Sequence, residues 1–465
     1  MSAADEDLAD FAVNRALASG ASYAEAYLLN EKSGSIAIEQ GVFNGAAATE
    51  SSGMRVRLIK KGRLFTFSTN MLSKERIEAS LRRARLFKGN SIVLSHEKVH
   101  RANYKAKQKK SFDSENPAED LAEYDRQLAK NRLVKYRSMY LGYSISNSYF
   151  TNSDGTKIRA TLPSISSFFS LILKSGSETR QRFLQYGGVG GYELFDLDKI
   201  GGEIEQEVKN LANVMSKGVS LSKSKLAEIR NVVVSPEISG IAVHESIGHP
   251  NEADRVFGRE AAQAGTSYLN GSNLGMQIGS GAVNIVDDPT IEGAYGFYLY
   301  DDEGVRAGPK LIVKNGMQNE LLLNREYAGM LGRKSNGSAR SSDYSVEPII
   351  RMSNTYLKPG NADFEDLIEE AGSGVYIKSF TEWNIDDTRS FAKYQGNEAY
   401  LIERGSIGKP VKNFSLEVST FNFWKSVKLV DNEFKLYLGT CGKGEPEQGV
   451  PVTMGGAAAL LSFGE

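Results

Sequence analysis

The sequence predicts an α+β protein in which small N-terminal α+β modules precede a large, mainly antiparallel β domain. The first observation is length, because 465 residues exceed what one ordinary hydrophobic core needs and so indicate several domains. The second is that helical segments alternate with pairs of strand-like runs up to about residue 225. The third is that glycines punctuate many short β-like runs from residue 228 onward, with few helical segments between them.

Changes in composition divide the chain into four segments. We expect an N-terminal α+β domain at 1–96, a linker at 97–117, a middle α+β domain at 118–225 and a C-terminal β domain at 226–465. The linker is predicted because it is rich in lysine and arginine, and because Asn116-Pro117 then opens a helix. Such a basic run could contact RNA or an acidic partner, but it is more typical of a solvated segment.

The N-terminal domain is expected to hold two helices and several strands. The first helix covers residues 4–18, where apolar residues recur near one side and Gly20 follows the end. Two strands, a hairpin and the second helix are expected at 23–29, 35–39, 54–59 with 65–67, and 73–86.

The middle domain is expected to begin with a helix at 118–137 and to end with one at 197–215. Between them, Asn152-Ser153-Asp154-Gly155 is a hairpin signal. The strands expected here are 144–150, 156–161, 166–173 and 181–186. In the C-terminal domain, strand-like runs occur at 231–234, 282–286, 310–313, 399–402 and 415–418.

Composition excludes several classes of protein. The formal net charge is −1, so no overall field attracts the chain to nucleic acid or to an anionic membrane. No stretch is apolar for long enough to cross a bilayer, and no apolar signal region follows the acidic N-terminus. The single cysteine, Cys441, excludes an intramolecular disulfide and fits a reducing compartment. We therefore expect a cytoplasmic protein with no nucleic-acid or membrane partner.

All four histidines stand in two clusters that each begin His-Glu. The first, His96-Glu97-Lys98-Val99-His100, has the spacing of a zinc-protease helix, on which the two histidines lie within ~40° of each other. Glu119 downstream is a possible third ligand. However, the charge of Lys98 opposes a divalent cation, and few apolar residues are present to form a dry cavity. We therefore expect a partly exposed linker here rather than a catalytic metal site.

The second cluster, His244-Glu245-Ser246-Ile247-Gly248-His249, has surroundings that suit burial. A strand-like run at 231–234 precedes it. Ser235-Pro236-Glu237 is a helix start, with a capping hydroxyl, a first-turn proline and an acid near the positive end. The next residues are largely apolar, so the cluster is predicted to lie on a buried helix.

The spacing of this second cluster requires an irregular helix. Five residues advance ~500°, which leaves His244 and His249 ~140° apart on a regular α-helix and unable to share one metal ion. The helix must therefore contain a π-type widening or stop near Gly248, where glycine would let the chain bend, and Pro250 prevents regular continuation. The alternative is a pair of core histidines beside a buried Glu245, with no metal.

A catalytic zinc ion usually has three protein ligands, and Cys441 is a candidate for the third. Glycines on either side allow close approach of the backbone, and Lys443 could help to hold a thiolate. No spacing rule links Cys441 to the histidines, however, and a small buried hydrophobe is the alternative role for it.

The second cluster, followed by Glu252 and Asp254, resembles the HExxxH signature of the TldD proteins. These belong to the TldD/PmbA family of modulator-of-gyrase-type metallopeptidases. Residues 51–57 in the N-terminal module also resemble the family. Further family-like blocks follow in the same order at 301–304, 336–337, 348–356, 398–402, 409–411 and 439–443. The resemblance covers nearly the whole chain and is sharpest between residues 230 and 455.

The resemblance implies a zinc ion held by His244, His249 and Cys441, with Glu245 as the catalytic base. TldD-type subunits carry the HExxxH motif and PmbA (TldE)-type subunits lack it, so this chain resembles the TldD type. The family also implies a peptide or unfolded polypeptide as substrate. The implied partner is a PmbA/TldE-type subunit in a heterodimer, or a second copy in a self-dimer.

One segment departs from the family pattern. Where the family usually has a glycine-rich segment before the block at 398–402, this chain has Thr381-Glu382-Trp383-Asn384-Ile385-Asp386-Asp387-Thr388. The family's substrate channel is therefore not carried over to this chain.

The expected mechanism is metal-assisted peptide hydrolysis, in which Glu245 takes a proton from water and passes it to the leaving amine. Metal-bound histidines commonly donate their other N–H to a carboxylate. The candidates for this support are Glu252, Asp254, Asp301 and Asp302, and those for stabilising the oxyanion are Arg340 and Tyr344.

Two other functions stay open on the sequence alone. The chain could be a metal-stabilised scaffold or binding subunit without catalysis. Structural zinc sites usually close with four protein ligands, often several cysteines, so the single cysteine favours an open site. The chain could also be a metal-dependent hydrolase of a non-peptide amide or ester.

Overall fold

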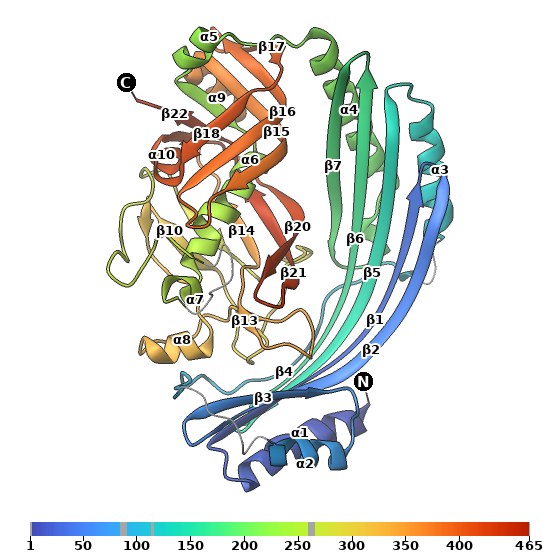
Figure 1. Cartoon of the computed structure of the whole chain (residues 1–465), viewed down its shortest axis with the longest axis vertical. Coiled ribbons are helices and arrows are strands. Elements are labelled where there is room, and N and C mark those ends of the chain that lie inside the picture. The colour runs from blue at the N-terminus through green and yellow to red at the C-terminus, as the bar shows by residue number, and fades with distance from the viewer. Residues whose placement is uncertain (1, 84–90, 113–115, 259–265, 465) are drawn as a thin grey trace.

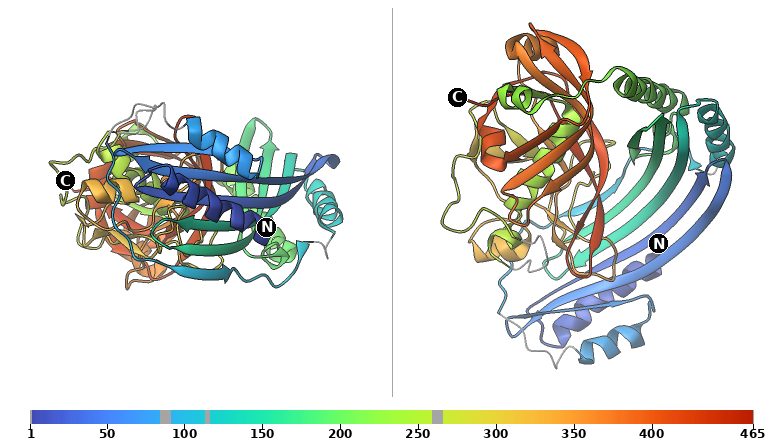
Figure 2. Two further views of the ribbon diagram at one scale, coloured as in Figure 1. Left: turned by 90° about the horizontal axis from the view of Figure 1, so that it is seen from below. Right: turned by 45° about the horizontal axis from the view of Figure 1, so that its top comes forward.

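The computed structural model describes residues 2–83, 91–112, 116–258 and 266–464. Over these residues, a long curved β-sheet from the N-terminal half of the chain wraps one side of a second body, which the C-terminal half forms (Figure 1). Two further views show the same arrangement (Figure 2). The predicted α+β fold class, with a C-terminal β domain, is confirmed.

The curved sheet has seven strands in the described chain. Their order is β3-β2-β1-β5-β6-β4, and β7 also pairs with β6. Neighbouring strands are antiparallel except β4 and β6. The strands are β1 (Tyr23–Glu39), β2 (Val42–Lys60), β3 (Arg63–Thr69), β4 (Arg101–Lys105), β5 (Val134–Asn152), β6 (Lys157–Ser175) and β7 (Glu178–Val189).

Several strands of this sheet are longer than predicted. β1 pairs with β5 from Glu25↔Asn152 to Glu39↔Ser138, so the runs expected at 23–29 and 35–39 belong to one strand. The runs expected at 156–161 and 166–173 likewise both belong to β6. Polar residues lie between or next to these runs. A sheet with one polar face accommodates them within a continuous strand.

The first two expected domains contribute to this one sheet, because β1 pairs with β5. The segment expected as a linker, 97–117, also contains β4, which pairs with the start of β6. The exposed Arg101 and Lys105 of β4 lie at the edge of the sheet, where charged side chains discourage pairing with another chain. The domain boundaries themselves stay predictions.

Four helices pack on one face of the curved sheet. α1 and α2 adjoin a buried cluster that includes Leu28 of β1, and α3 and α4 adjoin one that includes Ile38. Side chains alternate between the two faces of a strand, so Glu25 points the other way, toward the C-terminal body. The helices are α1 (Ala3–Ala18), α2 (Lys74–Arg83), α3 (Pro117–Ala129) and α4 (Leu197–Lys217).

One of these helices is shorter than predicted, and another can be compared with its prediction only in part. The helix expected at 118–137 ends at Ala129, and residues 134–137 instead open β5, where β-branched and aromatic residues favour a strand. The last part of the helix expected at 73–86, residues 84–86, lies outside the described residues.

The C-terminal body contains two larger sheets and a two-stranded one. The first sheet has the order β11-β10-β9-β14-β21-β20. Its strands are β9 (Ile285–Asp287), β10 (Lys310–Lys314), β11 (Met317–Gln318), β14 (Asn354–Leu357), β20 (Lys435–Lys443) and β21 (Gln448–Gly456). The two-stranded sheet joins β12 (Ala339–Arg340) and β13 (Ile349–Ile350).

The second large sheet has the order β17-β16-β15-β8-β22-β19, and β18 pairs with β16. Most pairs in the C-terminal body are antiparallel, and β14–β21 and β15–β8 are parallel. The strands are β8 (Asn231–Val234), β15 (Ser373–Ile385), β16 (Phe391–Glu403), β17 (Ser406–Val411), β18 (Ser415–Ser419), β19 (Val427–Val430) and β22 (Ala459–Ser462).

Helices in and near this body are short. One of them, α6, runs between the two large sheets and contacts strands of both. The helices are η3 (Tyr192–Leu194), α5 (Lys223–Glu228), α6 (Pro236–Val243), η4 (His244–Gly248), η5 (His249–Asn251), α7 (Ala253–Val256), α8 (Arg325–Met330), α9 (Phe364–Ala371) and α10 (Thr420–Lys425).

Buried charges join the curved sheet to the C-terminal body. Arg57 on β2 donates to Glu25 at 2.9 Å and to Glu303 at 2.8 Å. The main-chain N–H of Arg325 donates to the other carboxylate oxygen of Glu303 at 2.7 Å, and the Arg325 guanidinium donates to the hydroxyl of Tyr23. All five side chains are buried, so this network fixes the two bodies against each other.

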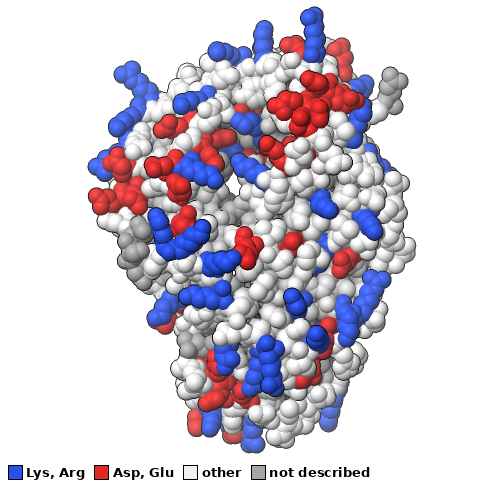
Figure 3. All heavy atoms as spheres, turned by 180° about the vertical axis from the view of Figure 1, so that it is seen from behind, with Lys and Arg blue, Asp and Glu red and all other residues white. Residues whose placement is uncertain are grey.

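Both signs of charge occur on the surface. On the face seen from behind, lysine and arginine side chains are interspersed with aspartate and glutamate (Figure 3). No helix of the described chain combines the length and the apolar character that spanning a lipid bilayer requires.

Candidate metal centre

The site begins where β8 leads into α6. Ser235 caps this helix, and its hydroxyl accepts the N–H of Ile238 at 3.3 Å. Pro236 lies in the first turn, as the sequence predicted. Every residue from Ile238 to Val243 is buried, so α6 delivers the histidine cluster into the interior between the two sheets.

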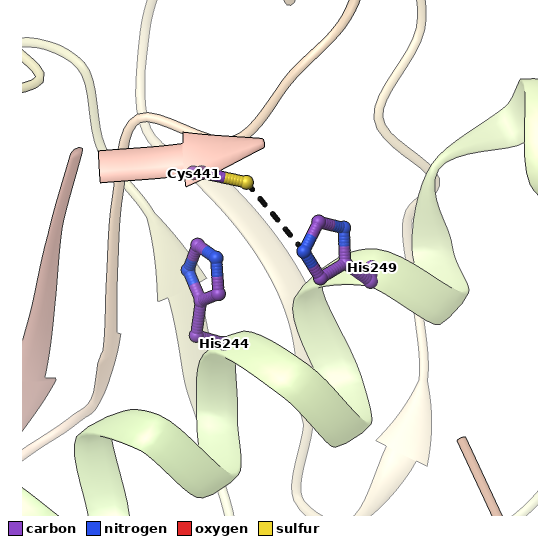
Figure 4. Close-up of side chains that lie close together, drawn as sticks. All are labelled: His244, His249 and Cys441. Atoms are coloured by element: carbon purple, nitrogen blue, oxygen red, sulfur yellow. Dashed lines mark hydrogen bonds between the residues drawn. The ribbon is translucent and has the colours of Figure 1, made fainter. Parts of the chain in front are cut away.

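The histidine cluster forms a π-helical turn. His244–Gly248 is a π-helix, and the 3₁₀ turn His249–Asn251 follows it at once. The widened turn places the two imidazole rings on one side, with centroids 4.9 Å apart and planes at 81° (Figure 4). Of the two predicted alternatives, a π-type widening or a stop near Gly248, the structure has the widening, which removes the angular separation that a regular helix would impose.

Polar side chains hold the π turn from several directions. The hydroxyl of Ser246 donates to the carbonyl of Ala242 at 2.6 Å and accepts the indole N–H of Trp424 at 2.9 Å. Tyr268 donates to the carbonyl of Ser246 at 2.8 Å. These bonds tie the main chain of the irregular turn to side chains around it.

Gly248 has a different role from the one predicted. Its φ of −58° and ψ of −64° are helical, so the turn does not need the conformational freedom of glycine. A Cβ at this position would lie 1.9 Å from the sulfur of Met352. Glycine is required here because a neighbouring side chain approaches the helix closely.

Cys441 lies on β20, which pairs with β21, and α6 packs against both strands. Its sulfur is 3.5 Å from Nε2 of His249 (Figure 4). One ligand atom from each of His244, His249 and Cys441 can be chosen so that all three lie within 4.8 Å of one another. The three residues are only 2%, 3% and 3% exposed.

The protonation states of these groups suit a metal ion. Burial lowers the pKa of both His244 and His249, which favours the neutral imidazoles that bind metals. Burial raises the pKa of the Cys441 thiol, but the contact with His249 and the nearby charge of Arg351 outweigh this effect, and the pKa lies below its usual value.

The donor set also fits a transition metal. Nδ1 of His244 is buried and has no hydrogen-bond partner in the described chain, although a buried imidazole nitrogen normally finds one. Two imidazoles and one thiolate are ligand types that zinc accepts. Across residues 2–83, 91–112, 116–258 and 266–464, this is the one group of three or more histidine, cysteine or acidic side chains arranged to hold an ion.

Buried charged side chains lie on the Nδ1 side of the His249 ring. Its Nδ1 lies 3.0 Å from Glu252, which also accepts from Arg255 at 2.8 Å. Lys443 is 3.2 Å from Glu252 and donates to Asp254 at 2.7 Å. The predicted support from Glu252 is therefore present. Lys443, which the sequence offered as a possible aid in holding the thiolate, instead neutralises these carboxylates.

Arg351 was missed by the sequence reasoning, although it lies in one of the family-like blocks. Its guanidinium is fully buried and donates to the main-chain carbonyls of Cys441 and, at 2.7 Å, Gln448. Because these residues lie on adjacent strands, Arg351 fixes the hairpin that carries the thiol.

Glu245 lies on the π turn next to His244 and is 7% exposed. Its carboxylate forms an ion pair with Arg389, which the sequence reasoning also missed. The two residues are 144 positions apart, so no local motif connects them.

Comparison with known proteins assigns the chain to a family. Residues 24–86, 108–215 and 228–460 match domain 1, the central domain and the C-terminal domain of the PmbA/TldA metallopeptidases. The chain belongs to the PmbA/TldD metallopeptidase family. The expectation of an enzyme of the metallopeptidase class is thereby confirmed at the level of the family.

Relatives of this PmbA/TldD family member carry matching names. A metalloprotease of Methanothermobacter thermautotrophicus is 36% identical over 67% of this chain and 65% of that protein. One of Methanocaldococcus jannaschii is 29% identical over 93% of this chain and 94% of its own length. A zinc metalloprotease TldD homolog of Saccharolobus solfataricus is 30% identical over 57% of this chain and 56% of that protein.

Solved structures share the fold of this PmbA/TldD protein. A Thermotoga maritima protein described as a modulator of DNA gyrase covers 98% of this chain and 99% of its own, with a TM-score of 0.75 and 18% identity. TldE from Thermococcus kodakarensis covers 99% and 100%, with a TM-score of 0.74 and 17% identity. At such identities, the likeness shows the fold alone.

Other predicted site residues of this family member have different contacts. Asp301 accepts main-chain N–H groups of its own turn, and Asp302 accepts from Ser341. The Arg340 guanidinium donates to two main-chain carbonyls, at 2.7 and 2.8 Å. The ring of Tyr344 packs over Gly53. We therefore assign none of these four side chains a direct role at the metal centre.

The first histidine cluster does not form a helix. Residues 92–100 are in extended or irregular chain, and His96 is exposed. His100 packs its ring edge-on against Tyr300, with centroids 5.2 Å apart. The expectation that this cluster is a partly exposed segment agrees with these positions.

Proposed function

We propose that this chain is a TldD-type, zinc-dependent peptidase that hydrolyses peptides or unfolded polypeptides. The observation that carries the proposal is the convergence of His244, His249 and Cys441 within 4.8 Å, with Glu245 next to His244 on the same π turn. Three protein ligands leave a fourth position for water or substrate, which distinguishes catalytic from structural zinc sites. Family membership and the zinc-dependent relative support the choice of metal.

In this proposal, His244, His249 and Cys441 hold the ion, and Glu252 orients His249 through Nδ1. Zinc bound there supplies the positive charge that polarises a scissile carbonyl and makes a water molecule more acidic. Glu245 accepts the proton of the attacking water and delivers it to the leaving amine, which balances the hydrolysis.

The proposed partner is a PmbA/TldE-type subunit or a second copy of this chain. It is supported by family membership and by the shared fold with TldE. The proposed compartment is the reducing cytosol, because a metal-binding thiol must stay unoxidised.

The first test is Glu245→Gln. The variant is expected to retain the zinc content of the wild type by elemental analysis. It should lose at least about 100-fold in kcat/KM on an unfolded peptide, because a general base contributes roughly 10²–10⁴ in rate. Chelation of the wild type should abolish cleavage, and added zinc should restore it.

The alternatives predict other outcomes. A metal-stabilised scaffold would hold stoichiometric zinc and cleave neither peptides nor small amides and esters. A hydrolase of a non-peptide amide or ester would cleave those compounds but leave peptides intact. Equal loss of zinc in Glu245→Gln would make this residue structural and remove its role as base.

A further inference from the structure

The ion pair of Glu245 joins the metal centre to a distant hairpin. Arg389 Nη1 donates to Oε2 of Glu245, and the two side chains are only 8% and 9% exposed. Arg389 lies in the turn between β15 and β16, immediately after residues 381–388. The segment before the turn therefore leads directly to a cation at the proposed base.

The turn holds Arg389 in an unusual backbone conformation. Its φ is +62°, which L side chains rarely adopt. The carboxylate of Asp386 accepts the N–H groups of Ser390 and Phe391, both at 2.7 Å. Thr420 donates to the carbonyl of Arg389 at 2.6 Å. Bonds within the turn and from Thr420 outside it thus help to fix this conformation, and such strained backbone is common at functional sites.

The guanidinium of Arg389 has at least one N–H group to which no described residue offers an acceptor. Nε of Arg389 is buried and has no hydrogen-bond partner among the residues that the structure describes. A guanidinium carries five N–H groups, and an unpaired buried donor is unfavourable. On the Glu245 side, Oε2 accepts from Arg389, and no described residue donates to Oε1. Both side chains therefore retain hydrogen-bonding capacity for other molecules.

We propose that Arg389 positions Glu245 with one N–H and binds a carbonyl or carboxylate oxygen of the substrate with the others. This inference rests on the proposed peptidase function. Holding Oε2 leaves Oε1 of Glu245 to face the attacking water. Donors fixed beside the metal centre suit an oxygen that gains negative charge during the reaction, because they need no rearrangement to stabilise it.

Arg389→Gly is the variant that tests the role in the reaction. Glycine adopts a φ of +62° without strain, so the turn should keep its shape while the guanidinium is removed. We expect unchanged zinc content and a loss of about 100-fold or more in kcat/KM on an unfolded peptide, by analogy with the removal of a fixed transition-state donor. Methylguanidinium, added far below unfolding concentrations, should restore part of the activity by filling the vacated space.

Arg404→Gly is the matched control. Arg404 also has a positive φ, +52°, and is exposed in the turn between β16 and β17. This variant should retain full activity and show no response to methylguanidinium. If Arg389→Gly keeps kcat/KM within about twofold of the wild type, the inference is overturned.

A second measurement does not depend on catalysis. In the metal-free protein, the loss of Tm is measured for Arg389→Gly, for Glu245→Gln and for the double variant. We expect the loss in the double variant to be smaller than the sum of the single losses, because the two side chains interact. Additive losses would overturn the positioning of Glu245 by Arg389.

Different results would contradict the proposed contact of Arg389 with substrate and the proposed peptidase function. If the wild type cleaves no peptide, the proposed function fails, whereas non-additive Tm losses still support the positioning of Glu245. If the wild type cleaves peptides, the same peptide is compared with a free and with an amidated C-terminus. This comparison shows whether Arg389 binds a carboxylate or a carbonyl oxygen of the substrate. A carboxylate contact makes Arg389→Gly lose more on the free acid, and a carbonyl contact gives equal losses.

Discussion

At the scale of single residues, burial sets the chemistry of the centre. The pKa of His244 and His249 is lowered because the charged imidazolium is poorly solvated inside the protein. Cys441 would have a raised thiol pKa for the same reason, but the neighbouring His249 reverses the direction. Burial therefore favours the neutral imidazoles that bind a divalent metal, and the contact with His249 eases the loss of the thiol proton that metal binding requires.

These shifts predict how stability depends on pH in the metal-free protein. Unfolded histidines titrate near pH ~6.5, whereas folded His244 and His249 titrate lower, so the unfolded state binds more protons between those values. The free energy of unfolding should therefore fall as pH decreases below ~6.5. Urea unfolding at pH values from about 7.5 to about 5.5 measures this pH dependence. The range brackets the unfolded pKa of about 6.5.

The control for this prediction replaces both histidines by glutamine. The pH dependence of the double variant should be weaker but not absent, because burial also lowers the pKa of His100. Glu252 does not confuse the comparison. Its pKa lies well below the usual value, so its contribution is lost only at pH values below about 4.3. If the free energy of unfolding of the double variant depends on pH as strongly as that of the wild type, groups other than His244 and His249 cause the pH dependence.

At the scale of elements, local patterns were predictable and long-range pairing was not. Ser235-Pro236 and the His244–His249 spacing predicted the helix start and the π widening, because both depend on adjacent residues. The hairpin around residues 152–155 was found for the same reason. Whether a serine- or glycine-containing run continues as one strand depends on its partner strand, so the lengths of β1 and β6 were missed.

The candidate metal ligands also divide into those that adjacent residues reveal and those that only distant contacts reveal. The histidines could be recognised from their own spacing, whereas Cys441 needed a family resemblance because β20 reaches α6 only in the folded chain. Arg389 and Arg351 act through contacts with residues far away in sequence. No pattern around either arginine signals such a contact, so only the structure identifies them.

The π turn yields a prediction at this scale through Gly248→Ala. The added methyl group would lie 1.9 Å from the Met352 sulfur, so the helix or Met352 must move. We expect a loss of about 1–3 kcal/mol in the free energy of unfolding, typical of overpacking, and weaker zinc binding. Urea unfolding and chelator competition measure the two effects.

Two further variants make this prediction specific. Gly202→Ala places a methyl group on α4 where no atom lies within 4 Å, so it should be neutral or stabilising. Combining Gly248→Ala with Met352→Ala should recover part of the lost zinc affinity by making space. If Gly248→Ala binds zinc like the wild type, the close packing against Met352 is not what shapes the site.

At the scale of the whole molecule, the centre lies inside the C-terminal body, and the curved sheet reaches that body through buried charges. Arg57 is almost fully buried between two acidic partners, Glu25 and Glu303. Glu303 in turn accepts the main-chain N–H of Arg325, at the start of α8. Arg57 of the curved sheet pairs with Glu303 of the C-terminal body as well as with Glu25 of its own sheet, so separating the two bodies would remove a charged partner from both Arg57 and Glu303.

This arrangement predicts a large effect of Arg57→Met on global stability. The substitution keeps an apolar side chain of similar length but leaves Glu25 and Glu303 buried without their cation. We expect the free energy of unfolding to fall by roughly 3–5 kcal/mol, as is typical when one partner of a buried pair is removed. The matched control is Lys107→Met, which breaks an exposed pair with Glu292 and should cost less than about 1 kcal/mol. Urea unfolding of both variants gives the comparison, and equal losses would show that the buried network does not hold the two bodies together.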